Sequence, residues 1–147
     1  MINESEFYTT ANTAIVTGCT LRQLQYWRIQ SIVLPIVDAK GTGHSVYYSV
    51  KNLRELVIFK ELLDHGLNFR FAQRCLNLLR VLNPNFNEVH CTTRYYFTSD
   101  RHQNIWLHSN KQEQLDYVLN GQPSYPLWLD RIYSKLTAAI NGHQTKQ

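Results

Sequence analysis

The side chains with the clearest chemistry in this sequence lie in a short segment after Thr20. On a helix that begins at Leu21, a turn of about 100° per residue places Leu21 and Leu24 on one side. The opposite side is polar and consists of Arg22, Gln23, Tyr26 and Gln30. Arginine and glutamine hydrogen-bond to base edges in a major groove, and arginine, tyrosine and threonine donate to phosphates. This face fits a nucleic acid, and a polar face turned only to water is the alternative interpretation.

Two short helices joined by a tight turn would hold this face in place. Thr10 can cap a helix over residues 11–16, and Thr20 can cap a second helix over residues 21–30. The first N–H groups of the second helix suit a phosphate. Between the helices, Gly18 supplies the backbone freedom that a sharp turn requires. This spacing is typical of a helix-turn-helix.

The next segment predicts a two-stranded ribbon followed by two longer helices. Residues 36–49 alternate apolar and aromatic pieces around the glycine-rich stretch 40–43, so we expect two strands and a tip, called the wing below. Ser49 can cap a helix that ends at Gly66, and a further helix is expected over residues 68–82.

After residue 84 the pattern predicts a hairpin and two more helices. Two stretches rich in β-branched and aromatic residues, 92–98 and 104–108, indicate paired strands. A helix capped by Ser109 should follow, and we expect its apolar residues to face inward: Leu115, Val118 and Leu119. Pro126 is expected to open a last helix, which Gly142 ends.

These elements predict a mostly α-helical chain with small β parts, which is an α+β fold. A winged helix-turn-helix over residues 1–84 would precede a small hairpin-plus-helices domain over residues 85–147. The length of 147 residues and a hydrophobic content of 44% fit one ordinary domain or two very small ones with a buried core.

Charge and hydropathy narrow the class of partner. The net charge is +4, and no acidic residue occurs between Phe7 and Val37, which favours an anionic partner for that stretch. No apolar run approaches the ~18 residues that a membrane-spanning helix needs. The amino terminus lacks the basic and then apolar order of a secretory signal, so we expect a cytoplasmic location.

The spacing of cysteines and histidines argues against a catalytic or metal site. The three cysteines form no C-x-x-C pair. His90 and Cys91 are adjacent, so on a strand they would point to opposite faces. The six histidines show no catalytic spacing with a nucleophile and a carboxylate. We therefore expect no enzymatic activity and no cofactor.

The order of the motifs in the first half resembles that of a known family. Its specific parts are the run Arg-Gln-Leu-x-Tyr-Trp from Arg22, the Gly-x-Gly tip before Tyr48 and Ser49, and a long helix ended at Gly66. From about Tyr8 to Leu82 the chain resembles the winged DNA-binding domain of MerR-family transcriptional regulators. The later residues also look like the short carboxy-terminal domain of one MerR-like subgroup.

The resemblance implies a homodimer on a near-palindromic site in double-stranded DNA. The helix after Thr20 would enter the major groove and the wing would contact the flanking backbone. Matched position by position, the implied contact residues are Thr10, Thr20, Arg22, Gln23, Tyr26, Lys40, His44, Tyr47 and Tyr48. Some members activate transcription by untwisting a promoter for RNA polymerase and others repress, and both possibilities stay open.

One departure from the family keeps a second function open. In the second strand of the wing relatives usually carry arginines, whereas this chain has His44, Ser45 and Val46, which removes charge that would neutralise phosphates. The alternative function is a protein-interaction module on a winged-helix fold with reduced DNA binding. Since family members that sense metals or oxidants use cysteines in the carboxy-terminal region, Cys91 also stays a candidate.

The dimer contact is expected in the carboxy-terminal half, because no heptad run for a coiled coil follows Leu82. That half holds nine of the eighteen aromatic residues. Filling of a small core is the first interpretation of these aromatic residues, and a ligand pocket is the second.

Overall fold

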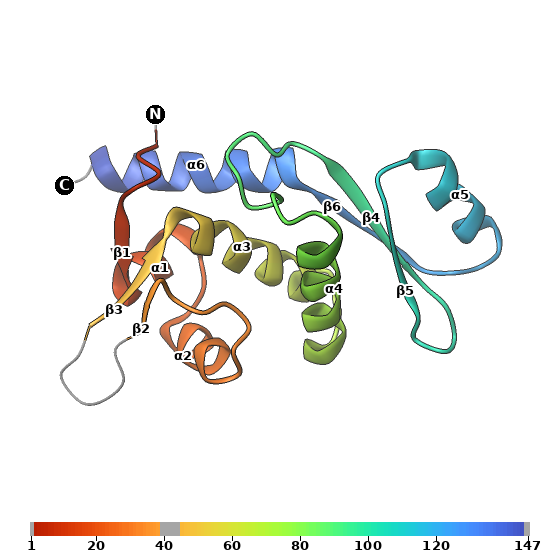
Figure 1. The fold of residues 1–147 in the computed structure, drawn as a ribbon, viewed down its shortest axis with the longest axis horizontal. Helices are drawn as coiled ribbons and strands as arrows, with labels where there is room; N and C mark the ends of the chain where they lie inside the picture. The colour runs from red at the N-terminus through yellow and green to blue at the C-terminus, as the bar shows by residue number, and fades with distance from the viewer. Residues whose placement is uncertain (1, 39–44, 146–147) are drawn as a thin grey trace.

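The computed structural model describes residues 2–38 and 45–145 of the chain. Over these residues helices dominate and two small antiparallel sheets accompany them (Figure 1), which confirms the predicted α+β class. In chain order the elements are β1 (Phe7–Thr9), α1 (Thr10–Thr17), α2 (Leu21–Ile29), β2 (Val37–Asp38), β3 (Val46–Ser49), α3 (Val50–Asp64), α4 (Phe69–Leu82), β4 (Arg94–Ser99), β5 (Ile105–His108), α5 (Lys111–Leu119), β6 (Ser124–Trp128) and α6 (Leu129–Thr145).

The helices α1 and α2 form the predicted helix-turn-helix. Gly18 ends α1 with φ of 76°, and its N–H donates to the carbonyl oxygen of Ala14 at 3.1 Å. The predicted cap at Thr10 is wrong by one residue, because the hydroxyl of Thr9 accepts from the N–H of Asn12 at 3.1 Å. The cap of α2 at Thr20 is confirmed.

The described parts of the wing belong to a three-stranded sheet. Strands β2 and β3 pair antiparallel, with Val37 opposite Tyr47. Strand β1, which the sequence pattern did not predict, pairs with the other edge of β3 and places Thr9 opposite Tyr47. The tip between β2 and β3, with Lys40 and His44, lies outside the described residues.

The helices α3 and α4 begin and end close to where the sequence predicts. The side chain of Asn52 accepts from the N–H of Ser49 at 2.9 Å and from the N–H of Ile36 at 3.0 Å. These two hydrogen bonds join the segment between α2 and β2 to the start of α3. Gly66, with φ of 91°, makes the turn into α4, and Asn68 caps α4. The ring of Trp27 on α2 meets that of Phe59 on α3 edge-on, at 4.9 Å between centroids.

The second sheet has the strand order β5-β4-β6 and corrects one prediction. The hairpin of β4 and β5 is confirmed. A helix beginning at Pro126 is wrong, because Ser124–Trp128 instead pairs with the free edge of β4, where Leu127 is buried and Pro126 is exposed. An edge strand tolerates a proline, which has no N–H to donate. The last helix begins at Leu129 and continues past Gly142.

The prediction for α5 is wrong in its orientation. Asn110, not Ser109, caps the helix, and no residue of α5 is buried. The three apolar residues expected inside are outside, and their exposed fractions are 43% for Leu115, 40% for Val118 and 75% for Leu119. The helix instead turns Tyr117 toward β5, where that ring lies 5.2 Å from Trp106 and 4.8 Å from His108.

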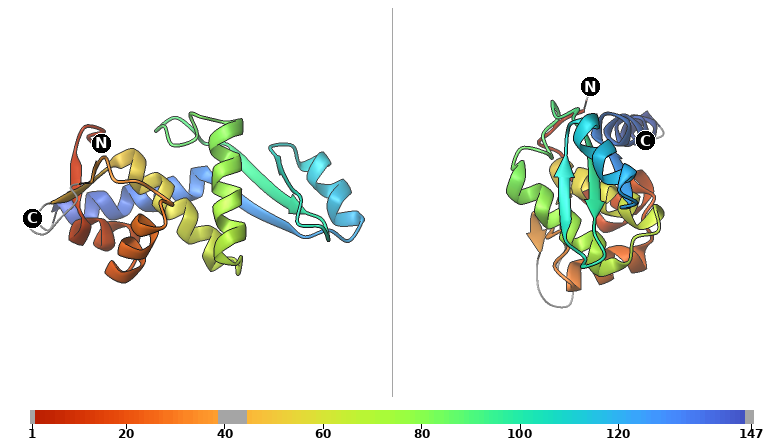
Figure 2. Two further views of the ribbon diagram at one scale, coloured as in Figure 1. Left: turned by 60° about the horizontal axis from the view of Figure 1, so that its bottom comes forward. Right: turned by 90° about the vertical axis from the view of Figure 1, so that its right-hand side faces the viewer.

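Helix α6 returns from the second sheet and packs along α1 and α3 (Figures 1 and 2). Its buried residues Leu136 and Ile140 join one continuous apolar cluster that extends from Tyr8 to Ile140. The division into domains at residues 84 and 85 stays a prediction. None of the helices that the structure describes is long and apolar enough to cross a membrane.

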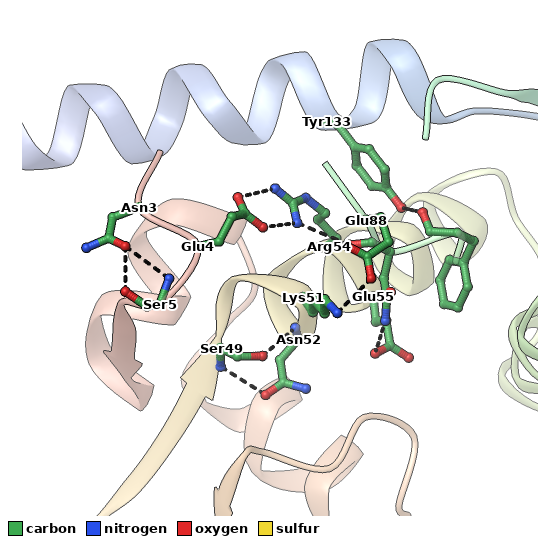
Figure 3. A network of polar contacts seen from close by, with 12 residues as sticks. Asn3, Glu4, Ser5, Ser49, Lys51, Asn52, Arg54, Glu55, Glu88 and Tyr133 are labelled. Atoms are coloured by element: carbon green, nitrogen blue, oxygen red, sulfur yellow. Dashed lines mark hydrogen bonds and ion pairs between the residues drawn. The ribbon is translucent and has the colours of Figure 1, made fainter. Parts of the chain in front are cut away.

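A buried arginine links four segments of this core (Figure 3). The guanidinium of Arg54 on α3 makes two hydrogen bonds with the carboxylate of Glu4, at 2.6 and 2.7 Å, and one with the carbonyl oxygen of Asn87 at 3.1 Å. It also lies 5.7 Å from the centre of the Tyr133 ring on α6. The hydroxyl of Tyr133 donates to the carbonyl oxygen of Phe86.

Candidate nucleic-acid interface

The outward face of α2 is fixed by two core side chains on its inner face. Leu24 is 1% exposed and Trp27 is 2% exposed. Residues at helical spacing on the opposite face are exposed, namely Arg22, Gln25, Tyr26 and Ile29. A helical pattern with Leu21 as the second inward residue does not include Gln25 in this face, whereas the buried Trp27 places it there. That placement of Leu21 is wrong, since its side chain is 57% exposed.

Tyr26 is held in position from beneath by the start of α4. Its ring packs against Phe69 at 5.3 Å between centroids, and Phe69 in turn packs against Phe59 at 5.4 Å. Tyr26 nevertheless keeps 49% of its surface exposed. The side chains of Arg22 and Tyr26 border a hollow of about 290 Å³ at the amino-terminal end of α2. The phenol is therefore both oriented and accessible, as a groove contact requires.

Thr20 and Gln23 form the cap of α2. The hydroxyl of Thr20 accepts from the N–H of Gln23 at 3.0 Å, and the Gln23 side chain accepts from the N–H of Thr20 at 2.9 Å. This reciprocal pair is a capping box, which stabilises the first turn of a helix. In the free chain, therefore, the side-chain oxygen of Gln23 is used within the protein, whereas Arg22 extends from the adjacent position.

The remaining predicted contact residues occupy different environments. Thr10 is half-buried at the first position of α1, and Tyr47 is half-buried on β3 between its neighbours β1 and β2. Tyr48 is 1% exposed, and burial raises the pKa of its hydroxyl. Its side chain is part of the core, and successive residues of a strand point to opposite faces, which explains why Tyr47 differs.

Arg28 forms an ion pair within the protein. Its guanidinium lies 3.2 Å from the carboxylate of Asp38 on β2. This ion pair ties the end of α2 to the base of the wing, so Arg28 does not replace the arginines missing from the wing strand. The outward face of α2 carries no acidic residue, and Arg22 supplies its positive charge.

Cysteines and histidines do not form a second site in the described part of the chain. There, no group of three or more potential ligand side chains is placed to hold a metal ion. Cys19 and Cys75 are buried, and burial raises the pKa of both thiols, to about 12 for Cys75. Cys91 is half-buried, and its sulfur lies 3.9 Å from the hydroxyl of Thr93.

The side chains of Thr98, His108 and Glu113 are arranged like a catalytic triad, but the hydroxyl of Thr98 is buried. The hydroxyl of Thr98 lies 2.9 Å from Nε2 of His108, and Nδ1 of His108 lies 3.3 Å from the carboxylate of Glu113. Thr98 is 0% exposed, so a substrate cannot reach its oxygen. Because Glu113 is on α5 and His108 is on β5, the three side chains attach α5 to the sheet.

Comparisons with known proteins agree with this geometry. Residues 8–79, which run from β1 into α4, match the model of the MerR HTH family regulatory proteins. Two proteins named as uncharacterized HTH-type transcriptional regulators, Rv1830 of Mycobacterium tuberculosis and Mb1861 of Mycobacterium bovis, are each 35% identical to the chain over 126 residues. The match covers 85% of this chain, so it continues past the matched domain into the second half.

The same match covers 53% of each relative, so the chain spans about half their length. Within that span, the cap at Thr20, the inward pair Leu24 and Trp27, and the turn at Gly66 place the matched motifs in a helix-turn-helix with a sheet and two following helices. At residues 8–79 the chain thus carries a helix-turn-helix domain of the MerR family.

Proposed function

We propose that this chain is a sequence-specific regulator of transcription that binds double-stranded DNA as a homodimer. The observation that carries the proposal is the outward face of α2, which is exposed, free of acidic residues and capped at Thr20. The family of residues 8–79 and the names of the relatives support it. Promoter DNA would be the route to any effect on RNA polymerase.

In this proposal α2 lies in a major groove, which is about 12 Å wide and admits a helix. Arg22 contacts a phosphate or a guanine edge, and the oriented phenol of Tyr26 donates to a neighbouring oxygen. Gln23 contributes chiefly through the capping box, because turning its side-chain oxygen to a base would cost the first turn one of its caps. Thr20 and Thr10 stand at the two helix starts, near the phosphates.

The wing contributes little charge through its described strands. Residues 37–38 and 45–49 include no lysine or arginine. Tyr47 is the wing side chain that we keep among the contacts, and Tyr48 is left out because it is buried. Fewer phosphate contacts make the affinity less dependent on salt, with log K changing by about 0.9 per contact against log salt.

The homodimer in this proposal follows from the two half-sites that such regulators occupy, and the uncovered apolar surfaces of the second half support it. The outer side of α5 presents Leu115, Val118 and Leu119. A groove of about 550 Å³ between α4 and β5 is lined by Leu78, Val81, Ile105 and Trp106, together with the polar residues Arg74, Asn77 and Asn104. A second copy would cover both surfaces if each α5 packed into the groove of its partner, since a two-fold interface pairs the same patches twice.

The experiment is selection of bound duplexes from a random library, followed by titration of the enriched duplex at fixed salt. Arg22→Ala should weaken binding by roughly 1 to 3 kcal/mol. Tyr26→Phe keeps the ring against Phe69 and removes only the hydroxyl, so it should cost less than Tyr26→Ala. Lys135→Ala removes one exposed positive charge from α6, a helix at the top of Figure 1 whereas α2 is at the bottom, and should leave the affinity unchanged.

Two results would count against the proposal. If Arg22→Ala and Tyr26→Ala bind the selected duplex as well as the unmodified chain, α2 is not in the groove. If no duplex is enriched at any salt concentration, the alternative of a protein-interaction module on this fold is favoured.

A further inference from the structure

The tip of the β4–β5 hairpin lies on the same side of the molecule as α2. In Figure 1 α2, the start of α4 and the hairpin tip all lie at the bottom of the molecule, and the right view of Figure 2, turned about the vertical axis, agrees. The hairpin belongs to the second half of the chain, outside the matched domain of residues 8–79. A ligand that extends past α2 along this side therefore reaches the tip.

The tip is held in a defined conformation. The carboxylate of Asp100 accepts from the N–H groups of His102 and Asn104, both at 2.9 Å, and from the Asn104 side chain at 2.9 Å. Gln103 adopts a φ of 64°, and its carbonyl oxygen accepts from the guanidinium of Arg74 at 2.7 Å. The hydrogen bond from Arg74 docks the tip on α4. Arg101 at the turn is exposed.

Positive charge continues from α2 to this tip without acidic interruption along α4. From His65 to Asn87 the sequence has no acidic residue. Arg70 and Arg74 are exposed on α4, and Arg70 follows Phe69, which packs under Tyr26. The carboxylate of Asp100 is the acidic group at the tip itself, and it is turned onto the N–H groups described above.

We propose that Arg101 at this tip contacts the DNA backbone beyond the groove that α2 occupies, together with Arg70 at the start of α4, whereas Arg74 holds the tip in place. The inference rests on the proposed function. An arginine at a rigid exposed turn suits a phosphate, because its guanidinium donates two parallel hydrogen bonds to phosphate oxygens. A backbone contact adds affinity without sequence preference, and it makes the second half of the chain part of the DNA footprint.

The test measures the salt dependence of binding to a duplex of mixed sequence, by fluorescence anisotropy with the whole 147-residue chain. Arg101→Ala should lower the slope of log affinity against log salt by about 0.9 for each bound copy of the chain, the value for one lost phosphate contact per copy. Arg101→Lys keeps the charge and should restore most of the slope. Lys135→Ala removes the same charge from α6 and should leave the slope unchanged. The ranking of different duplex sequences should not change in any of these variants.

Failure of this inference and failure of the proposed function give different results. If the unmodified chain binds the duplex and Arg101→Ala gives the same slope, the contact at the tip is wrong and the role of α2 is unaffected. If Lys135→Ala lowers the slope as much as Arg101→Ala, the effect is one of total charge, and the contact is again wrong. If the unmodified chain binds no duplex even at low salt, the proposed function itself is wrong.

Discussion

At the scale of single residues, Arg54 connects parts of the chain that are distant in sequence. Its side chain is 4% exposed, whereas that of Glu4 is 39% exposed, so the pair lies at the edge of the core with the arginine inside. The guanidinium donates hydrogen bonds to the carboxylate of Glu4 and to the carbonyl oxygen of Asn87. A buried charge requires such partners. The ion pair therefore fixes the amino-terminal segment against α3.

Glu4→Gln should destabilise the protein by about 2 to 3 kcal/mol, because a buried guanidinium then loses its opposite charge. Urea unfolding at neutral pH measures the change. Asp64→Asn is the matched control, since Asp64 pairs with Lys60 on the surface, away from Arg54, where ion pairs contribute little. Equal midpoints for Glu4→Gln and the unmodified chain would show that Arg54 does not depend on this carboxylate.

At the scale of elements, α2 and α5 are held in opposite ways. Helix α2 has two nearly fully buried anchors, Leu24 and Trp27, and a capping box at its start. Helix α5 has no buried residue and is held by Tyr117 against Trp106 and His108, and by the contact of Glu113 with His108. Elements with few buried apolar contacts open first, so in the monomer α5 should be the less stable of the two.

Hydrogen exchange followed by mass spectrometry should show this difference. Tyr117→Ala removes both ring contacts, each worth about 0.5 to 1.5 kcal/mol, and should speed exchange of the α5 amides by roughly tenfold. Leu119→Ala, on the exposed side of the same helix, should have little effect in a monomer. Unchanged exchange in Tyr117→Ala would mean that other contacts hold α5.

At the scale of the whole molecule, one apolar cluster and two uncovered apolar surfaces have separate consequences. The cluster joins α6 to α1 and α3, so the second half of the chain supports the helix-turn-helix directly. The uncovered surfaces are the outer side of α5 and the groove between α4 and β5. The proposed homodimer would cover the two uncovered surfaces and leave the apolar cluster unchanged.

Leu119→Glu should therefore shift the protein from dimer to monomer without unfolding it, because a charge cannot be buried in an apolar groove without a partner. Sedimentation velocity over a range of concentrations measures the shift, and circular dichroism checks the fold. Val89→Glu is the control, since Val89 is also exposed, at 48%, but lies in the loop before β4. A dimer that survives Leu119→Glu would place the contact elsewhere.

The sequence by itself determined the local features of the helix-turn-helix half. The caps at Thr20 and Ser49 and the turns at Gly18 and Gly66 are found where the pattern predicts them. Each depends on hydrogen bonds or dihedral angles within three or four residues, so the residues concerned are visible as neighbours in the chain. The exposure of Arg22 and Tyr26 on one face of α2 could also be predicted, because it follows from their spacing along a single helix.

Only the tertiary structure decided which faces are covered. The buried position of Tyr48, the outward apolar side of α5 and the strand at Pro126 all depend on partners far away in the sequence. Strand β6, for example, forms because the edge of β4 is available to it, and no neighbour of Pro126 in the chain carries that information. Local hydrogen bonding fixes where a helix starts, whereas packing between distant segments fixes which way it faces.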